Sequence, residues 1–263
     1  MTVVFAVDFI PKNRLFSPMP IRFLTARWSN LALLNYAVPE SYFAPYLPPG
    51  CVADTSLDGR AYCSLVAFDF LETRVLGIPW PGFRNFPEFN LRLYIRHVPS
   101  GDRGVVFVRE IIPSRFISAV ARWTYNEPYL ALPLTSSARL HDARLTIEHR
   151  LPHAGRHNRL TLTAAATPQL PPPGAWETFF KEHRWGFNRS ASGKLIRYEV
   201  VHAPWRCHAV ESHDLDWDFE SLYGPPWTSL ADRPPDSVLL AEGSPVAIHL
   251  WKSTKEQVKG RGA

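Results

Sequence analysis

The alternation of apolar and polar residues is clearest in the middle of the chain. Residues 60–75 are rich in β-branched and aromatic side chains, and both faces of a strand built from them would be largely apolar. One face would carry Tyr62, Ser64, Val66, Phe68 and Phe70, and the other would carry Cys63, Leu65, Ala67, Asp69 and Leu71. This pattern predicts a strand buried on both sides, as in the wall of a barrel or sandwich.

Residues 88–98 form a second predicted strand, whose two faces differ sharply. One face carries Phe89, Leu91, Leu93 and Ile95, and the other carries Glu88, Asn90, Arg92, Tyr94 and Arg96. Such a polar face either fronts solvent or lines a polar cavity. The preceding segment, GIPWPGFRNFP at residues 77–87, is predicted to be a loop stiffened by its prolines.

A third strand is predicted at residues 104–112, which are apolar except at Arg109 and Glu110. Neighbouring residues of a strand point to opposite sides, so we expect these two on opposite faces of the wall. Pro113 and Ser114 then begin a predicted helix that runs to about residue 123.

Further strand patterns occur at residues 143–151, 159–166, 195–203 and 245–251, and a second helix is predicted at residues 175–184. No internal repeat or linker interrupts this order. The predicted fold class is therefore mainly β (α+β), an antiparallel barrel or cone with a few flanking helices. We expect a single domain over residues 1–251 and a basic tail over residues 252–263.

Composition and charge argue against several classes of function. The net charge of +5 is small and scattered, without the basic face and interleaved aromatics of a nucleic-acid site. No apolar run approaches the roughly 20 residues that span a bilayer, and the N-terminus lacks the basic start of a signal peptide. Three cysteines without a C-x-x-C pair fit a reducing compartment. We expect a cytoplasmic protein with no nucleic-acid or membrane partner.

The familiar motifs for phosphate, dinucleotide, nucleophile-elbow and zinc-protease sites are absent. His149, His153 and His157 recur every four residues, as metal ligands on a helix can. Pro152 and Gly155 would break such a helix, so a hairpin with surface histidines is the preferred interpretation. Neither a metal nor a cofactor is predicted.

Three runs carry a resemblance to a known family: LVAFDFLETRVLGIPWPGFRNFPEFNLRLYIR, RGVVFVREIIPSRF and YNEPY. They closely resemble the DUF2071 family, an uncharacterised bacterial family that is similar to the acetoacetate decarboxylase-like superfamily. The resemblance extends from about Trp28 to Trp251. It implies a cone-like antiparallel β-barrel around a central cavity.

In the decarboxylases of that superfamily, a lysine just beyond the corresponding proline forms a Schiff base with a ketoacid. In this sequence the positions after Pro113 hold Ser114, Arg115 and Phe116, and no lysine lies between Lys12 and Lys181. An arginine stays protonated and cannot act as the amine nucleophile. Schiff-base decarboxylation is therefore not expected.

The retained charged residues supply the first candidate site residues. Arg74, Arg92 and Arg109 are arginines on strand-like segments, and a planar guanidinium suits a carboxylate or phosphate ligand. Glu110 and Glu88 are the carboxylates best placed for acid–base catalysis, because burial without a cation would raise their pKa. The alternative is that these arginines and glutamates only form ion pairs with each other.

Further candidates for ligand binding are Asn90 on the polar strand face and Asn126 and Tyr129 of the N-E-P-Y run, which also contains Glu127. Asn and Pro in that run favour a turn, and a turn at a barrel mouth can present side chains to a ligand. Trp80 of the stiff loop would form a rim or lid. The alternative for each is a plain structural role.

Three functions remain open at this stage. The preferred one is a binder of a small organic molecule, including an anionic one, in the barrel cavity. The second is a lysine-independent lyase or hydrolase acting on a small organic acid. The third is a structural or interaction protein whose cavity is filled by its own side chains. The expected partner is a small-molecule ligand, and formation of a homo-oligomer is left open.

Overall fold

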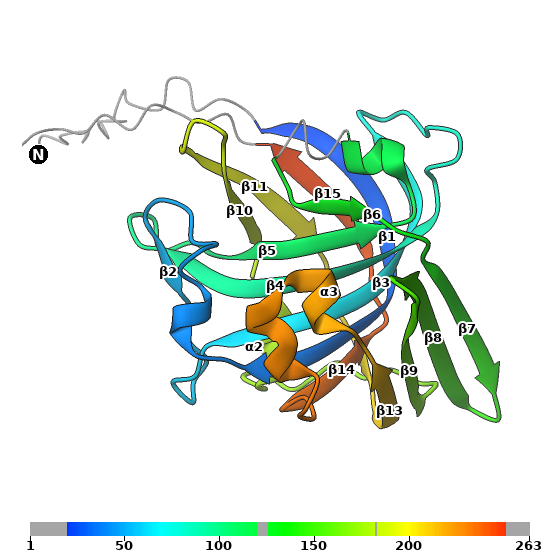
Figure 1. The fold of residues 1–263 in the computed structure, drawn as a ribbon. Coiled ribbons are helices and arrows are strands. Elements are labelled where there is room, and N and C mark those ends of the chain that lie inside the picture. Colours follow the sequence, from blue (N-terminus) through cyan, green and yellow to red (C-terminus); the bar gives the residue numbers. More distant parts are fainter. Residues whose placement is uncertain (1–19, 120–125, 182, 251–263) are drawn as a thin grey trace, which may run out of the picture.

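Seven of the strands close into a barrel in the computed structural model, which describes residues 20–119, 126–181 and 183–250 (Figure 1). The barrel strands are β1 (Ile21–Ala37), β3 (Tyr62–Val75), β4 (Phe86–His97), β5 (Arg103–Ile112), β10 (Trp185–Arg189), β11 (Leu195–His202) and β15 (Pro245–Leu250). The order around the ring is β1-β15-β11-β10-β5-β4-β3, and β3 pairs with β1 to close it. The expected β-barrel is confirmed.

The barrel is mixed rather than purely antiparallel, which corrects the sequence-based expectation in one respect. β10 pairs with β5 in parallel at Trp185–Gly104 and Gly186–Val105, whereas its other neighbours in the ring run antiparallel. Parallel neighbours require a long crossover. The chain between β5 and β10 supplies one, because it runs through three strands of a second sheet, described below, before it returns to the barrel. Gly104 lies at this seam, where a Cβ atom would stand 2.3 Å from the Trp185 carbonyl oxygen.

Bulges bend the longest strands around the ring. β1 pairs with β3 along its length but slips register between Ser29 and Ala32, where Asn30 has a φ of 55°. β3 carries a further bulge at Glu72, whose φ is 54°. Such irregularities increase the twist and curvature of a strand. The curved β1 can therefore pair with β15 and with β3, and this closes the sheet.

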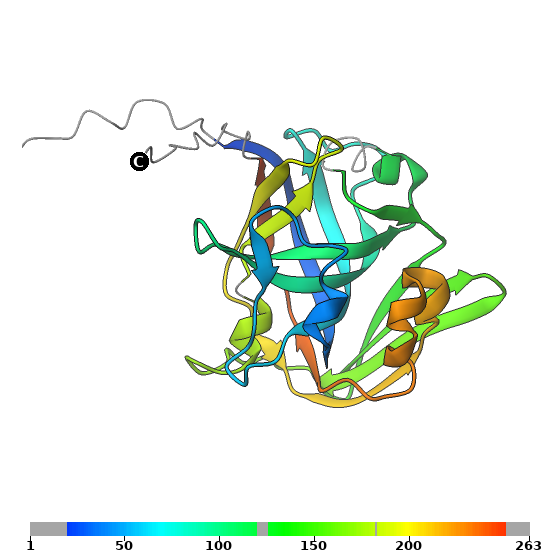
Figure 2. The same cartoon turned by 60° about the vertical axis from the view of Figure 1, so that its left-hand side comes forward.

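A second, four-stranded antiparallel sheet lies beside the barrel (Figures 1 and 2). Its strands are β7 (Thr135–His141), β8 (Arg144–His153), β9 (Arg156–Ala165) and β13 (Val210–Asp216). Short strands extend the large sheet: β2 (Cys51–Ala53), β6 (Tyr129–Ala131), β12 (Cys207–His208) and β14 (Ser237–Ala241). The helical turns are η1 (Glu40–Tyr42), α2 (Glu177–Lys181), α3 (Phe219–Tyr223) and η2 (Pro225–Leu230).

The two faces of the barrel wall belong to two separate cores, as the alternation predicts. The outward residues Leu65, Leu91 and Leu93 pack in a cluster with Ile147 and Leu160 of the second sheet. The inward residues of the same strands form the other cluster: Tyr62, Val66, Phe68, Phe70 and Tyr94. The wall is therefore buried on both sides, which explains the near-continuous apolar sequence of residues 60–75.

The hairpin of β8 and β9 confirms the hairpin interpretation of the histidine segment but not the surface position of every histidine. His149 is fully buried, with its ring centroid 5.3 Å from that of Phe89. The two-residue period of β8 places His149 on the same face as Leu151, which packs in the cluster between the second sheet and the outer side of the barrel wall. Burial lowers the pKa of His149 to about 4, so this imidazole is neutral at physiological pH.

One part of the barrel interior is filled by α2. Phe179 and Phe180 pack against the inward rings of Tyr62 and Tyr94, with centroid distances of 5.2 to 6.2 Å. The segment after α2 is anchored by His183, whose Nδ1 donates to the Phe179 carbonyl oxygen at 2.7 Å. The His183 Nε2 lies 2.9 Å from Asp54 Oδ2, which also accepts from Arg103 Nε at 2.6 Å.

The predicted helices are shorter than expected in the described residues. The sequence predicted a helix over residues 175–184, but α2 spans only five residues, because Trp185 already begins β10. The helix after Pro113 is present at residues 115–119, and the rest of its predicted span lies outside the described residues, as does the basic tail. Within the described ranges, no helix has both the length and the apolar character to span a bilayer.

Candidate functional site

The part of the barrel interior that α2 leaves unfilled is a cavity of about 140 Å³. Most of its wall is apolar, and aromatic residues of the inward strand faces contribute much of it: Trp28, Phe68, Phe70, Phe86 and Phe107. Against this apolar surface lie seven polar residues: Glu88, Asn90, Arg92, Glu110, Glu127, Tyr129 and Tyr198. A concave apolar site with a few convergent polar groups is typical of small-molecule binding.

Strand register brings the first polar residues together. Glu88 and Asn90 are two residues apart on β4 and so share a face, and Asn90 Nδ2 donates to Glu88 Oε1 at 3.1 Å. Asn90 pairs with Glu110 of β5, and Glu110 pairs with Tyr129 of β6. The Tyr129 hydroxyl donates to Glu88 Oε2 at 3.4 Å. Three neighbouring strands thus place their polar side chains at one level of the barrel.

The third carboxyl group, that of Glu127, comes from the turn before β6. Asn126 adopts the left-handed conformation with φ 54°, and its Nδ2 donates to the Arg189 carbonyl oxygen at 2.7 Å. This turn directs Glu127 into the cavity, where its Oε1 accepts from the Tyr198 hydroxyl at 3.0 Å. Tyr198 of β11 faces Gly186 of β10, where a Cβ atom would lie 2.1 Å from the tyrosine ring. Gly186 is therefore required for this position of Tyr198.

All three glutamates are buried, at 2% to 4% exposure. No ion pair among the described residues joins any of them to a cation. Arg92 lines the cavity, but its guanidinium donates to the Tyr94 hydroxyl at 3.2 Å and to the Phe180 carbonyl oxygen at 3.0 Å. The alternative interpretation, in which these arginines and glutamates form ion pairs with each other, is therefore not seen among the described residues that line the cavity.

Burial without a cation raises the pKa of each glutamate. Burial raises the pKa of Glu88 to about 8, against hydrogen bonds from Asn90 and Tyr129 that lower it. Burial also raises the pKa of Glu127 to about 8. For Glu110, burial and the nearby Glu127 and Glu88 raise the pKa well above its ordinary value. Carboxyl groups with pKa values near neutrality can donate or accept a proton under physiological conditions.

The structure places five of the sequence-predicted site residues in this cavity: Glu88, Asn90, Arg92, Glu110 and Tyr129. The other four candidates do not line it. Arg74 is exposed, because the bulge at Glu72 shifts the alternation of β3 and turns Val75 inward instead. Arg109 faces the opposite side from Glu110 and donates to the Leu222 carbonyl oxygen of α3.

Asn126 and Trp80 also lie outside the cavity lining. Asn126 shapes the turn that carries Glu127, as described above, and its own amide is bound to Arg189 on β10. Trp80 is 45% exposed in the loop between β3 and β4. In the same region Phe83 stacks on Phe116 with ring centroids 5.1 Å apart. The stiff loop therefore packs against the helical segment, whose Ile117 lines the cavity.

Sequence reasoning missed Tyr198 as a site residue, as well as the aromatic wall. Residues 195–203 show an ordinary strand pattern, so Tyr198 carries no local signal for a functional role. The one available signal is the pairing of Gly186 with a large residue, and the register that creates it is not readable from sequence.

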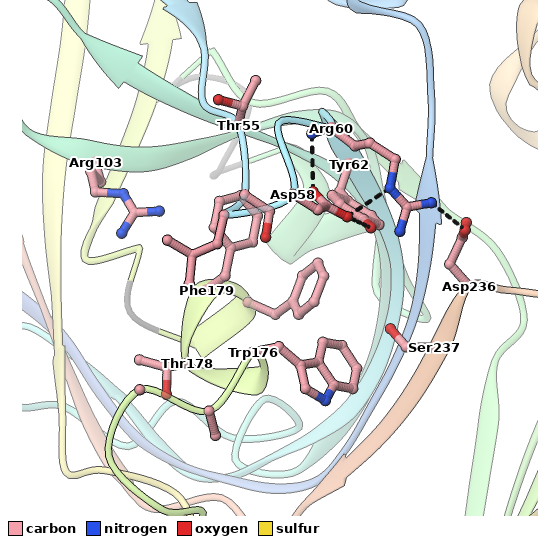
Figure 3. A pocket seen from close by; sticks show the side chains of 15 residues that line it. Thr55, Asp58, Arg60, Tyr62, Arg103, Trp176, Thr178, Phe179, Asp236 and Ser237 are labelled. Atoms are coloured by element: carbon pink, nitrogen blue, oxygen red, sulfur yellow. Dashed lines mark hydrogen bonds and ion pairs between the residues drawn. The ribbon is translucent and has the colours of Figure 1, made fainter.

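A larger cleft of about 640 Å³ is lined in part by α2 and by the inward-facing Tyr62 (Figure 3). Its charged residues mostly satisfy each other. Arg60 bonds to Asp58 at 2.6 Å and to Asp236 at 2.9 Å, and Tyr62 donates to Asp58 at 2.8 Å (Figure 3). Four of the buried polar atoms without a hydrogen-bond partner among the described residues belong to the lining of the barrel cavity, and none belongs to the lining of this cleft. The barrel cavity is therefore the stronger functional candidate.

Comparison with known proteins agrees with the fold. The DUF2071 family, described as an uncharacterised conserved protein, matches residues 25–245. The uncharacterised protein YqjF of Bacillus subtilis (strain 168) is 28% identical over 120 residues, or 45% of this chain. That match spans about half of the curated relative, 48% of its length.

Two solved structures are similar over nearly the whole chain. An acetoacetate decarboxylase-like enzyme from Sphingomonas wittichii RW1 has a TM-score of 0.58 at 13% identity, covering 89% of this chain and 95% of that one. The enduracididine biosynthesis enzyme MppR complexed with pyruvate has a TM-score of 0.57 at 14% identity, covering 95% and 96%. At such low identity these similarities establish the acetoacetate decarboxylase-like fold and nothing finer.

The buried glutamates predict an unusual dependence of stability on pH. In the folded protein the pKa values of Glu88 and Glu127 are about 8, whereas in the unfolded chain a glutamate titrates near ~4.3. At a pH between the unfolded and the folded pKa values, the folded state binds more protons than the unfolded chain does. The free energy of unfolding should therefore fall as pH rises from about 5 to about 8, by up to ~1.4 kcal/mol per pH unit for each group.

Urea unfolding measured across this pH range tests the expectation. The Glu88→Gln variant should show a shallower fall and be more stable than the wild type at pH about 8, by a few kcal/mol. Glu199→Gln is the matched control, because Glu199 is also buried on a barrel strand but is paired with Arg184 and lies outside the cavity. A wild-type profile that is flat or rises with pH would contradict the burial of neutral carboxyl groups.

Proposed function

Because the chain belongs to the DUF2071 family and has the acetoacetate decarboxylase-like fold, we propose that its barrel cavity binds a small organic molecule without using a Schiff-base lysine. The observation that carries this proposal is the presence of three buried carboxyl groups without a cation in an otherwise apolar cavity. Among the described residues, Asn90 Oδ1, Glu110 Oε2 and Glu127 Oε2 are buried and have no hydrogen-bond partner.

Unpaired buried polar atoms are costly, and a folded protein retains few of them. Groups that lower stability in this way are concentrated at functional sites, where a ligand supplies the missing partner. Three such atoms from β4, β5 and the turn before β6 converge on a single cavity. A bound molecule with matching polar groups would satisfy them, and this is the simplest reason for keeping them buried.

The size of the cavity restricts the ligand. An apolar cavity of roughly 150 Å³ is large enough to bind benzene, so about 140 Å³ suits a molecule of similar bulk. The aromatic wall would bury its apolar part, and the polar residues would fix its orientation. MppR, which has the same fold, is described as complexed with pyruvate, which supports a small-molecule role for this chain.

The positions of the described lysines support a mechanism without a Schiff base. Lys181 lies at the end of α2, where its Nζ donates to the Trp205 carbonyl oxygen at 3.2 Å, in a groove separate from the cavity. Lys194 is exposed in the turn before β11. Among the residues that the structure describes, neither of these amines lines the cavity.

A second candidate function is a lysine-independent enzyme, of lyase or hydrolase type, acting on a small organic acid. The observation that favours it is the pair of carboxyl groups with pKa values of about 8, since Glu88 and Glu127 could each move a proton near neutral pH. Of the three arginines considered for binding such an acid, Arg92 alone lines the cavity. Simple binding therefore remains the preferred function.

A ligand screen by thermal shift tests the binding proposal. Compounds of about six to eight non-hydrogen atoms should raise the melting temperature, because they bind only the folded state, and above Kd the shift should grow with the logarithm of ligand concentration. Val66→Phe places a larger side chain in the cavity wall and should abolish the shift, whereas Glu199→Gln should retain it. If no compound of any charge binds at the cavity, the protein is a structural or interaction protein and the proposal fails.

Turnover of any bound compound distinguishes the enzyme from the binder. If the protein is an enzyme, Glu88→Gln and Glu127→Gln should lower kcat by about 100-fold or more, the usual contribution of a general acid or base. A compound that binds tightly and is recovered unchanged favours the binder.

Borohydride treatment in the presence of acetoacetate tests the absence of Schiff-base chemistry. We expect intact-protein mass spectrometry to show no reduced adduct, because neither described lysine reaches the cavity and arginine cannot form an iminium. A stoichiometric adduct that maps to a single lysine would overturn this part of the proposal.

A further inference from the structure

The cavity holds more acidic groups than basic ones, and the imbalance points to the charge of its ligand. We infer that the ligand is a small organic cation, a primary ammonium group on a compact apolar body. This inference rests on the proposed function, since it names the class of molecule that the barrel cavity would bind.

Four buried polar atoms without a hydrogen-bond partner belong to described residues that line the cavity, and three of them match an ammonium group. Asn90 Oδ1 is an acceptor, as are Glu110 Oε2 and Glu127 Oε2 when their carboxyl groups are ionised, and a primary ammonium group has three N–H donors and no acceptor. The fourth atom, Trp28 Nε1, is a donor. The three residues that carry the acceptors are 3% to 4% exposed, so water does not readily replace the missing partner. An anion would offer only further acceptors to these atoms.

Charge complementarity leads to the same conclusion. Glu88, Glu110 and Glu127 line the cavity from β4, β5 and the turn before β6. The one basic residue in the lining, Arg92, already donates to Tyr94 and Phe180. A carboxylate ligand would thus face three acidic groups and a single guanidinium that already makes two hydrogen bonds, whereas a cation would find a counter-charge on the side formed by β4, β5 and the turn before β6.

The aromatic part of the wall also suits a cation. The rings of Trp28, Phe68, Phe70 and Phe86 form a continuous cluster, with neighbouring centroids 4.8 to 5.2 Å apart. Aromatic faces attract ammonium groups, more strongly when water is excluded. The same rings would bury the apolar body of the ligand, so one surface serves both parts of the molecule.

A neutral ligand that accepts hydrogen bonds from protonated carboxyl groups is the main competitor, and pH separates the two. The titratable and charged groups facing the cavity are Glu88, Arg92, Glu110, Glu127, Tyr129 and Tyr198. Burial and the acidic neighbours raise the pKa of Tyr129 further above its ordinary value, so this hydroxyl stays neutral. The glutamates are therefore the groups that change charge near neutrality.

The expected direction follows from the pKa values of about 8 for Glu88 and Glu127 in the free protein. A cation favours the ionised carboxylate and must displace a proton to bind at pH about 7. Its affinity should rise about tenfold per pH unit up to about 8 for each proton released. A neutral or anionic ligand that needs the protonated form should bind less well as pH rises.

Isothermal titration calorimetry with three matched probes tests the inference: isoamylamine, isoamyl alcohol and isovalerate. They have branched apolar bodies of similar size, suited to the cavity, and differ mainly in the charge of the head group. We expect the amine to bind, with an affinity about tenfold higher at pH 7.5 than at pH 6.5 and with a binding heat that depends on the buffer's ionisation enthalpy. The alcohol and the acid should bind at least tenfold more weakly.

Variants of the cavity glutamates test which side chains bind the amine. Glu110→Gln and Glu127→Gln preserve side-chain shape and should each weaken amine binding tenfold or more, whereas Glu199→Gln should leave it unchanged. The pH series on the wild-type protein requires no variant and decides the matter if a variant fails to fold. Preferential binding of the alcohol or isovalerate would overturn the cation assignment and leave the binding function intact. Failure of all three probes would count against both.

Discussion

The closure of the β-barrel is the constraint on which the rest of this structure depends. Once the ring is closed, every second residue of its strands must point into a confined interior and the others must point outward. The outward residues are covered by the second sheet, by α3 and by η2. Closure itself depends on the seam between β5 and β10, where Gly104 permits the close approach of Trp185. A side chain at this glycine would separate the two strands that complete the ring.

The interior is divided by chemistry into two regions. Around α2 it is packed with aromatic rings and stabilised by burial, as an ordinary core is. Toward the other region the inward positions of β4 and β5 hold Glu88, Asn90 and Glu110, to which the turn before β6 adds Glu127. Apolar residues at these positions would give a more stable barrel, because buried carboxyl groups without a cation lose their hydration. The barrel thus gives up stability at the level of the cavity, where these carboxyl groups converge.

The similarity to the acetoacetate decarboxylase-like fold separates scaffold from chemistry. The fold is shared at 13% to 14% identity, so the backbone arrangement tolerates replacement of most side chains. In this chain carboxyl groups converge at the cavity, and neither of the described lysines lines it. A fold of this kind specifies a confined interior with inward-pointing positions, and the residues at those positions determine what it does.

The sequence by itself determined the strands of the wall and the division of their faces. The period-two pattern over residues 60–75 and 88–98 separated the inward residues from the outward ones, and it placed Arg109 and Glu110 on opposite sides. Local pattern suffices for this, because side-chain direction along a strand depends only on backbone geometry. The same pattern misplaced Arg74, since the bulge at Glu72 depends on pairing with a distant strand.

Only the tertiary structure decided which polar residues share one cavity. Glu127 and Tyr198 are separated by 71 positions, and they meet because β10 and β11 pair opposite the turn that holds Glu127. The tertiary structure also decided that Arg92 donates hydrogen bonds to Tyr94 and Phe180. It further decided that no described cation forms an ion pair with the glutamates of the cavity. Charge balance within a cavity depends on register between strands far apart in the chain. For that reason the sequence could name Glu88 and Glu110 but could not show that they lie unpaired beside Glu127.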